Sequence, residues 1–498
     1  KTKKKKEIVD LKKHGIQELP PAIGVLKCKE LILSENDIGT IPEEIGKLPN
    51  LEVLDLSKNR INGLPPEIGQ LKTLRELNLS ANKLFYAPLS PELGKLNALR
   101  KLNLSENQLD ELPPQLGDLR SLEVLILAQN QIKTIPPEFG KLENLLQLDL
   151  SNNTLKTVPS ELFAATRLDY IDLSNNGLTK IPAEIGNLKS LKVLKVGFNK
   201  LAELPPEVSL LTSLTHLEVR DNPALQQLPP LDNLVNLQVF NMRNTQLPEV
   251  PREIVKFQNL IELDLRENAQ IREIPREIGL LKSLKRLDLY GNKLKSIPAE
   301  IGLLINLVTL DLRNNHLSAE TLPREIGNLV ALKKLLLSGN LLSTLPPEIK
   351  YLSNLQELDV SNNTLNTLPD ELGELRALTK LNLSGNKLTT LPASVGNLTA
   401  ITILDLKSNE VAELPPTVGK LEACTKIDLS HNMLTELPWE LGQLDKNLNI
   451  LDVGHNPLII PPRPVLNKGT AEIVAWLKKN EKEGRKTKVS GLAIKTDK

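Results

Sequence analysis

Leucine and isoleucine recur along the chain in a fixed frame of about 23 residues. One copy begins at 54–59, which reads Leu-Asp-Leu-Ser-Lys-Asn, and continues at 64–69 as Leu-Pro-Pro-Glu-Ile-Gly. The opening stretch returns almost unchanged at 77–82 and at 381–386. Alternating apolar and polar residues predict a short, half-buried strand. The following Leu-Pro pair breaks that strand, because proline cannot donate to a sheet.

An asparagine closes the strand stretch in nearly every copy. It recurs at positions 36, 59, 82, 107, 130, 153, 176, 199, 222, 268, 292, 315, 340, 363, 386, 409, 432 and 456, and Thr245 takes its place once. A degenerate first copy, with His14 at this position, brings the total to about 20 copies. A buried asparagine can satisfy backbone groups where the chain leaves a strand, so these residues predict a ladder that joins successive copies.

Segments such as 42–46, which reads Pro-Glu-Glu-Ile-Gly, predict a short helical turn with proline starting it and glycine closing it. Stacked copies would then form a parallel β-sheet on a concave side, with strands ~4.8 Å apart. The short helical or 3-10 turns would lie on the convex side. No single copy can bury its own leucines, so we expect stability to be shared between neighbours.

This frame resembles that of the leucine-rich-repeat family and covers residues 8–466. Its Leu-Pro-x-x-Ile-Gly form is similar to an intracellular subclass that includes the Ras-associated Shoc-type scaffold and the plant Ras-group proteins. The resemblance implies an α/β repeat fold, a leucine-rich-repeat solenoid shaped like a horseshoe. It also implies protein partners on the concave face, which in the resembling scaffolds are a Ras-type GTPase and a phosphatase catalytic subunit.

The two ends of the chain differ from the repeats. Residues 1–7 form a basic stub, which keeps the first strand edge soluble or serves as a nuclear-import or anionic-membrane patch. Residues 467–483 predict a capping helix with Thr470 as its N-cap, and 484–498 predict a flexible tail. The helix would cover the last apolar edge with Ile473, Val474, Trp476 and Leu477. A similar segment closes the Ras-group proteins.

Composition excludes several classes of partner. The 62 Lys and Arg residues are balanced by 61 Asp and Glu, and aromatic residues make up 2% of the chain. Neither feature suits nucleic-acid binding, which uses a net basic face or stacking platforms. No apolar run reaches the ~20 residues of a membrane helix, and no signal peptide is visible. The two cysteines, Cys28 and Cys424, fit small buried side chains in a reducing compartment. We therefore expect a cytoplasmic monomer without stable membrane insertion.

The sequence offers little catalytic chemistry. It contains no phosphate-binding loop, no dinucleotide fingerprint and no paired-cysteine metal motif. His431 and His455 precede the frame asparagine in adjacent copies and could sit within ~5 Å of each other. A third ligand is not obvious, so two solvated imidazoles are the better interpretation. We predict no enzyme activity, no cofactor and no metal.

The clearest departure from the frame lies two residues before the frame asparagine, a position we call the serine column. It holds serine in most early and late copies, including Ser57 and Ser361, but becomes Gly197 and then a run of arginine and tyrosine in the middle. Phe198 and Tyr170 lie on the N-terminal side of this run. With its charged neighbours, the predicted concave ridge comprises His216, Glu218, Arg220, Asp221, Arg243, Glu262, Asp264, Arg266, Arg286, Asp288, Tyr290, Asp311 and Arg313.

Two interpretations of this ridge remain open. It is either a solvated lattice of ion pairs or a docking surface, since Arg and Tyr are enriched where interface energy concentrates. Clustering in consecutive copies favours docking. The leading hypothesis is a non-enzymatic scaffold whose concave face binds a Ras-family GTPase or another signalling protein. The alternatives are a structural component of a cytoskeletal or axonemal assembly, or a secreted bacterial or parasite protein that engages host proteins.

Overall fold

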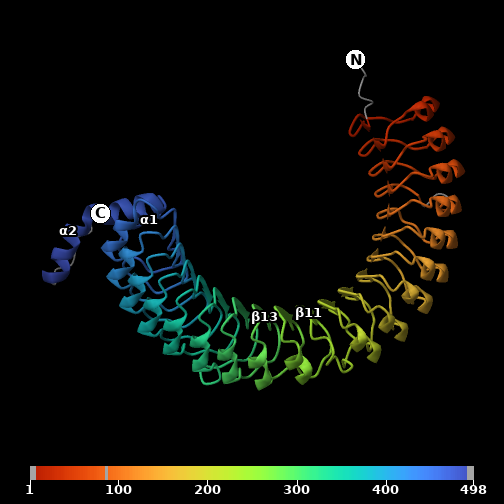
Figure 1. Ribbon diagram of the computed structural model, residues 1–498. Helices are drawn as coiled ribbons and strands as arrows, with labels where there is room; N and C mark the ends of the chain where they lie inside the picture. The colour runs from red at the N-terminus through yellow and green to blue at the C-terminus, as the bar shows by residue number, and fades with distance from the viewer. Residues whose placement is uncertain (1–6, 85–87, 491–498) are drawn as a thin grey trace, which may run out of the picture. The chain divides into compact units, whose positions relative to one another are not determined.

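Nearly every copy of the frame folds into one turn that consists of a three-residue strand and a five-residue 3-10 helix (Figure 1). The computed structural model describes residues 7–84 and 88–490. Most of the expected basic stub and the last eight residues of the expected tail lie outside this range. The chain divides into two compact units, Lys1–Leu247 and Pro248–Lys498. Their boundary falls inside the predicted solenoid, and each unit is described by itself.

In the first unit, each strand pairs in parallel with the strand of the next turn. The strands are β1 Ile8–Asp10, β2 Glu30–Ile32, β3 Val53–Asp55, β4 Glu76–Asn78, β5 Lys101–Asn103, β6 Val124–Ile126, β7 Gln147–Asp149, β8 Tyr170–Asp172, β9 Val193–Lys195, β10 His216–Glu218 and β11 Val239–Asn241. The 3-10 helices are η1 Pro21–Val25, η2 Glu43–Lys47, η3 Pro66–Gln70, η4 Pro91–Lys95, η5 Pro114–Asp118, η6 Pro137–Lys141, η7 Ser160–Ala164, η8 Ala183–Asn187 and η9 Pro206–Leu210.

The second unit repeats this parallel pairing. Its strands are β12 Glu262–Asp264, β13 Arg286–Asp288, β14 Thr309–Asp311, β15 Lys334–Leu336, β16 Glu357–Asp359, β17 Lys380–Asn382, β18 Ile403–Asp405, β19 Lys426–Asp428 and β20 Ile450–Asp452. Its helices are η10 Arg252–Lys256, η11 Arg276–Leu280, η12 Ala299–Leu303, η13 Arg324–Asn328, η14 Pro347–Tyr351, η15 Asp370–Glu374, η16 Ala393–Asn397, η17 Pro416–Lys420, η18 Trp439–Leu444, α1 Arg463–Leu466 and α2 Thr470–Ser490.

Within each unit the strands line the inner side of the arc and the 3-10 helices line the outer side (Figure 1). The leucines of the Leu-x-Leu pairs fill the space between these two layers, and Leu54 and Leu56 are fully buried. The residue between them, Asp55, is half-buried on the inner face. The strand and solenoid architecture predicted from the repeat is therefore confirmed, and the inner face presents alternate strand residues.

The predicted asparagine ladder is present. The amide Nδ2 of Asn59 donates to the carbonyl oxygens of Leu56 and Ser57 in its own turn, at 3.0 and 3.2 Å. It also lies 3.0 Å from the carbonyl oxygen of Leu33 in the preceding turn, while its Oδ1 accepts the Ile38 N–H at 3.0 Å. Because one buried side chain satisfies four backbone groups in two turns, it fixes their spacing.

The prediction that glycine closes the helical turn was wrong. Gly46 is the fourth residue of η2, and the helix continues to Lys47. A Cβ atom at Gly46 would lie only 2.5 Å from the carbonyl oxygen of Glu67 in the next turn. Glycine is needed there because neighbouring 3-10 helices approach closely, and backbone geometry at a helix end is not the reason.

The C-terminal helices cover the last turn. On α2, Ile473, Val474 and Leu477 are buried, and the Trp476 ring stacks on Trp439 of η18 with centroids 5.6 Å apart. The helix extends to Ser490, so residues 484–490 are helical where the sequence predicted a flexible tail. In the part of the chain that the structure describes, no helix is long and apolar enough to cross a membrane.

Thr470 does not act as the predicted N-cap. It is the first residue of α2, and its Oγ1 accepts the N–H of Leu451 in β20 at 2.9 Å. The hydroxyl therefore satisfies a donor on the edge strand instead of a donor in the first turn of its own helix.

Candidate binding surface

In ordinary turns whose strand ends in aspartate or asparagine, the serine column completes a small hydrogen-bonded loop at the end of the strand. The Ser57 hydroxyl and the Ser57 N–H both donate to Oδ1 of Asp55, at 2.7 and 3.0 Å. Ser80 makes the same two bonds to the amide oxygen of Asn78, at 2.8 and 3.1 Å. Aspartate and asparagine are interchangeable at this strand position, because one side-chain oxygen can accept both the serine hydroxyl and the serine N–H.

In the second unit, arginine replaces this serine and binds the same acceptor. Nε of Arg266 donates to Oδ1 of Asp264 at 3.0 Å, and Nη2 donates to Oδ2 at 2.6 Å. Arg313 repeats the arrangement on Asp311, at 2.9 and 2.5 Å. These two-point bonds hold each guanidinium flat against its own turn, and the neighbouring carboxylates raise the pKa of both arginines.

Asp288 lies between these two pairs. The parallel register places it opposite Asp264 on one side and Asp311 on the other, and Arg266 Nε lies 3.3 Å from its Oδ2. Burial and the adjacent Asp311 raise the pKa of Asp288 to about 6, although the Tyr290 N–H and Arg266 act in the opposite direction. Three carboxylates in consecutive turns thus share compensating arginines.

Two further contacts between predicted residues flank this row. The guanidinium carbon of Arg313 lies 5.4 Å from the centre of the Tyr290 ring, a cation–π distance. Arg286 and Glu262 form an ion pair between adjacent strands. The eight predicted residues of the second unit, from Glu262 to Arg313, therefore form one connected patch on the exposed face of three strands.

In the first unit, Arg220 forms an ion pair with Glu218, and its guanidinium carbon lies 4.7 Å from the centre of the Phe198 ring. Phe198 is 42% exposed and has a φ of 51°, a left-handed conformation that is uncommon for residues with bulky side chains. Gly197 provides the space for this stack, since a Cβ there would lie 3.0 Å from Cγ of Arg220.

The other predicted residues of the first unit are held locally. The Nδ1 of His216 lies 2.8 Å from the Thr215 hydroxyl. Oδ1 of Asp221 accepts a hydrogen bond from the Asn244 side chain at 2.8 Å. The Arg243 N–H donates to Oδ1 of Asn241 at 3.1 Å, so its turn has an amide where the other arginine turns have a carboxylate.

Sequence reasoning named Tyr170 but missed the cluster that it forms with Asp172 and Lys195. The Tyr170 hydroxyl donates to Oδ2 of Asp172 at 3.2 Å, and Nζ of Lys195 lies 3.7 Å from the same oxygen and 5.5 Å from the tyrosine ring centre. Burial and the Asp172 charge raise the pKa of Tyr170. The available signal was Lys195 itself, because this strand position otherwise holds mainly aspartate or asparagine.

The remaining candidate chemistry is sparse. The rings of His431 and His455 stack with centroids 4.1 Å apart, as predicted. Among residues 7–84 and 88–490, no group of three His, Cys, Asp or Glu side chains could hold a metal ion. Cys28 and Cys424 are buried and form no disulfide, and burial raises the pKa of the Cys424 thiol to about 11. A thiol of this kind is a poor nucleophile at neutral pH.

Comparison with known proteins points to one family. A family model described as a leucine-rich repeat region matches residues 89–168 and 307–408, and leucine-rich-repeat models match 27–84, 166–224 and 283–304. The leucine-rich repeat protein lrrA of Dictyostelium discoideum is 61% identical over 87 residues, which are 18% of this chain and 17% of that protein.

Solved structures agree in fold. A leucine-rich-repeat protein of Leptospira interrogans is 39% identical, with a TM-score of 0.70, over 76% of this chain and 95% of that chain. The plant peptide hormone receptor RGFR1, in complex with RGF2, is 27% identical over 91% of this chain and 86% of its own, with a TM-score of 0.67. The ectodomain of the Arabidopsis receptor kinase HAESA, bound to an IDA peptide hormone, is 28% identical over 90% of this chain and 81% of that chain, with a TM-score of 0.59.

Proposed function

Because this chain belongs to the leucine-rich-repeat family, we propose that it is a non-enzymatic scaffold that holds a protein partner on the strand-lined face of its turns. Leucine-rich-repeat domains are typical of protein–protein interaction scaffolds, and the solenoid fold is generally a binding fold. The HAESA ectodomain holds an IDA peptide hormone, and the hormone receptor RGFR1 holds RGF2. The proposal assigns binding here to the turns whose serine column carries arginine or tyrosine.

The observation that carries this proposal is the fixed geometry of the arginines. Arg266 and Arg313 are each bound at two points by the carboxylate of their own turn, and each side chain remains between a third and two fifths exposed. A side chain already held in one conformation loses little entropy when a partner binds. Arginine and tyrosine are also the residues that most often supply interface energy.

The frame itself does not need these arginines. In ordinary turns a serine hydroxyl fills the same hydrogen-bonding role at Asp55 and at Asn78. Partly exposed ion pairs contribute little to stability, so an ion-pair lattice alone gives no structural reason for replacing serine in successive turns. A surface that presents prearranged guanidinium groups to a partner does give a reason.

The partner that the family resemblance implies is a Ras-family GTPase, bound by a monomeric scaffold in the cytoplasm. The mixed charges of the surface support a partner with both signs of charge, attracted by electrostatic complementarity more than by apolar area. On this proposal the protein acts in signalling by bringing its partner to a fixed position. The same surface would serve a constitutive assembly if the partner were a structural protein.

The test replaces Arg266 and Arg313, both in the second unit, with serine, which restores the residue of the ordinary turns. A matched control replaces Arg276 and Arg324, which are exposed on η11 and η13 of the outer layer, with serine. We expect affinity capture from the native cell, quantified by mass spectrometry, to lose its main partner only with the inner-face variant. A purified Ras-family GTPase, loaded with either GDP or a GTP analogue, tests the partner class directly.

An unchanged partner set for the inner-face variant would exclude this surface as the binding site. If the inner-face variant loses its partner but the GTPase binds neither the variant nor the wild type, the surface is still the binding site. The partner is then not a Ras-family GTPase.

A further inference from the structure

The edge strand β20 carries hydrogen-bond donors whose equivalents in earlier turns bond to the next turn. In the turn before it, the Leu429 N–H donates to the carbonyl oxygen of Asp452 at 2.7 Å, and the His431 N–H donates to that of Gly454 at 2.9 Å. The equivalent donors of the last turn are the N–H groups of Val453 and His455. Neither has a hydrogen-bond partner within the described part of the chain.

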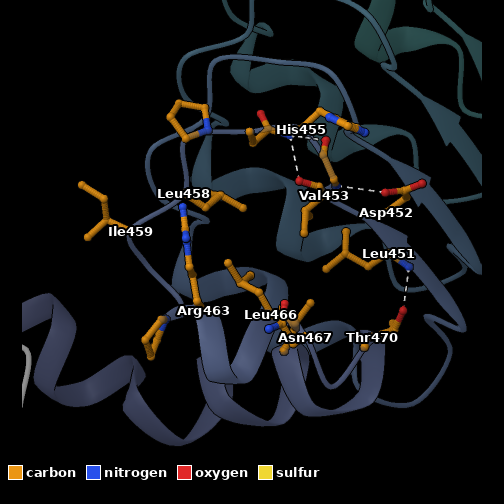
Figure 2. Close-up of a pocket in the computed structure, with 16 residues that line it drawn as sticks. Leu451, Asp452, Val453, His455, Leu458, Ile459, Arg463, Leu466, Asn467 and Thr470 are labelled. Carbon is orange, nitrogen blue, oxygen red and sulfur yellow. Dashed lines mark hydrogen bonds between the residues drawn. The ribbon is translucent and has the colours of Figure 1, made fainter. Parts of the chain in front are cut away.

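The C-terminal cap satisfies only one donor of this edge. The Thr470 hydroxyl accepts the Leu451 N–H at 2.9 Å (Figure 2), so it stands where the carbonyl oxygen of a further strand would lie. Beyond Thr470 the chain turns into α2 and leaves the next two donors uncovered. The cap therefore satisfies the first donor of the edge, the Leu451 N–H, and leaves the N–H groups of Val453 and His455 open.

A cleft of about 940 Å³ lies beside these open donors. One wall is the edge of β20 with the segment that follows it, and the other is formed by α1 and the start of α2 (Figure 2). Leu458, Leu466 and Ile473 line it, and Ile459 at its rim is 64% exposed. Apolar walls with a few convergent polar groups are typical of a ligand site.

The charged groups of the cleft favour an acidic ligand. Arg463 extends from α1 toward the segment that contains Leu458 (Figure 2), and no carboxylate among the described residues forms an ion pair with it. Asp452 also lines the cleft and keeps its charge; its Oδ1 accepts the Gly454 N–H at 3.0 Å, and it forms no ion pair with Arg463 among the described residues. The Arg463 guanidinium, which has no ion-pair contact in the range that the structure describes, and the two open N–H groups all require oxygen acceptors.

We propose that this cleft binds an extended, acidic peptide segment of a partner protein. The peptide adds a strand to β20, and two of its carbonyl oxygens accept the N–H groups of Val453 and His455, as in other peptides that extend a sheet. A Glu or Asp side chain of the peptide pairs with Arg463, and an apolar side chain rests on Ile459. This site is separate from the arginine turns and does not depend on them.

The geometry favours a peptide over a second copy of this chain. A second solenoid would have to bring a whole turn to the edge, whereas α1 and Thr470 stand beside it and leave room for one segment. A strand of four residues spans ~13 Å, and the cleft volume lies in the range of small-ligand sites, roughly 300–1,000 Å³, so it holds one short segment.

The test selects a phage-displayed library of random heptapeptides on the full chain and measures the enriched peptides by fluorescence anisotropy. We expect peptides rich in Glu and Asp whose affinity falls at least tenfold with Arg463→Glu. Lys468→Glu is the matched control, because Lys468 is exposed and adjacent but does not line the cleft; it should change affinity less than twofold. Hydrogen exchange should show that bound peptide protects the amides of Val453 and His455.

Several results would overturn the proposal. Failure to enrich any peptide would do so, as would equal affinities for the two variants or unprotected amides at 453 and 455. A dimer in light scattering that Arg463→Glu dissociates would assign the edge to a second copy instead. Since Arg463 is exposed on a surface helix, its replacement should leave the unfolding midpoint unchanged, and this keeps a loss of binding interpretable.

Discussion

The serine turns and the arginine turns satisfy the same acceptor in two ways. In a serine turn such as that of Ser361, one hydroxyl donates to Oδ1 of Asp359 at 2.7 Å. In the turn of Arg313, a guanidinium binds both carboxylate oxygens of Asp311, and the side chain of Asp311 is only 4% exposed. The backbone bond beneath them is the same, since the N–H of Ser361 and that of Arg313 each lie 3.1 Å from Oδ1.

This comparison separates the frame from the surface. In the turn of Arg313 the frame asparagine and the buried leucines are as they are in serine turns, so these residues determine the fold. The turn of Arg243 differs, because Thr245 takes the place of the asparagine. The serine column changes without disturbing either, so its variation is available for recognition. A substitution should therefore have the same effect in both kinds of turn if it alters the frame, and different effects if it alters the inner face.

The largest expected effect comes from the shared frame. Asn315 in an arginine turn and Asn363 in a serine turn each donate to three carbonyl oxygens and accept one N–H, at distances from 3.0 to 3.2 Å. Replacing either by alanine leaves buried backbone groups unsatisfied, which should lower the free energy of unfolding by about 3 kcal/mol. Urea denaturation should give equal losses in the free energy of unfolding for the two variants. Clearly unequal losses would show that the asparagine has a different structural role in the arginine turns.

The second prediction distinguishes the two inner faces. Asp311→Asn removes the charge that binds the partly exposed Arg313, so it should lower the free energy of unfolding by about 1 kcal/mol, the upper end for such an ion pair. Asp359→Asn should cost less than about 0.5 kcal/mol, because native serine turns already use asparagine, as at Asn78 and Asn382. The same denaturation measurement compares them. Equal losses would mean that the carboxylate charge has no special role beside arginine.

Much of the fold could be predicted because each turn repeats the same physical problem. The strand alternation, the buried Leu54 and Leu56 and the asparagine ladder all follow from residue types at fixed spacing. The role of Gly46 could not be predicted in this way, because the pattern shows where glycine recurs and not which neighbour approaches it. Only the position of the Glu67 carbonyl oxygen, 2.5 Å from the place that a Cβ atom of residue 46 would occupy, reveals the close contact.

The candidate surface was predictable only in outline. Departure from the serine column identified Arg266 and Arg313, but the sequence did not show that each binds the carboxylate two residues earlier. The contribution of Lys195 was missed because attention to the serine column passed over the strand position two residues earlier, where lysine replaces the usual aspartate or asparagine. Thr470 was misassigned since a threonine before a helix usually caps it, whereas here the edge of β20 competes for the same hydroxyl.

The smallest expected effect concerns how charge is shared among the arginine turns. Burial and Asp311 raise the pKa of Asp288 to about 6 in the folded protein, above the ordinary value of about 4 for an unfolded chain. The folded protein therefore holds this proton more tightly. The contribution of Asp288 to the free energy of unfolding should fall as the pH rises from about 4 to about 6 and stay constant above that.

Asp288→Asn isolates this contribution, because the amide oxygen can still accept the Tyr290 N–H that Asp288 binds at 3.1 Å. The difference between the wild-type and variant free energies of unfolding should change by about 1 kcal/mol or less between pH 4 and pH 6, since the side chain is 29% exposed and solvent screens it. At pH 7 the variant should be at least as stable as the wild type. If wild type and variant show the same dependence of the free energy of unfolding on pH, Arg266 fully compensates the charge of Asp288. Asp264, Asp288 and Asp311 would then act independently of one another.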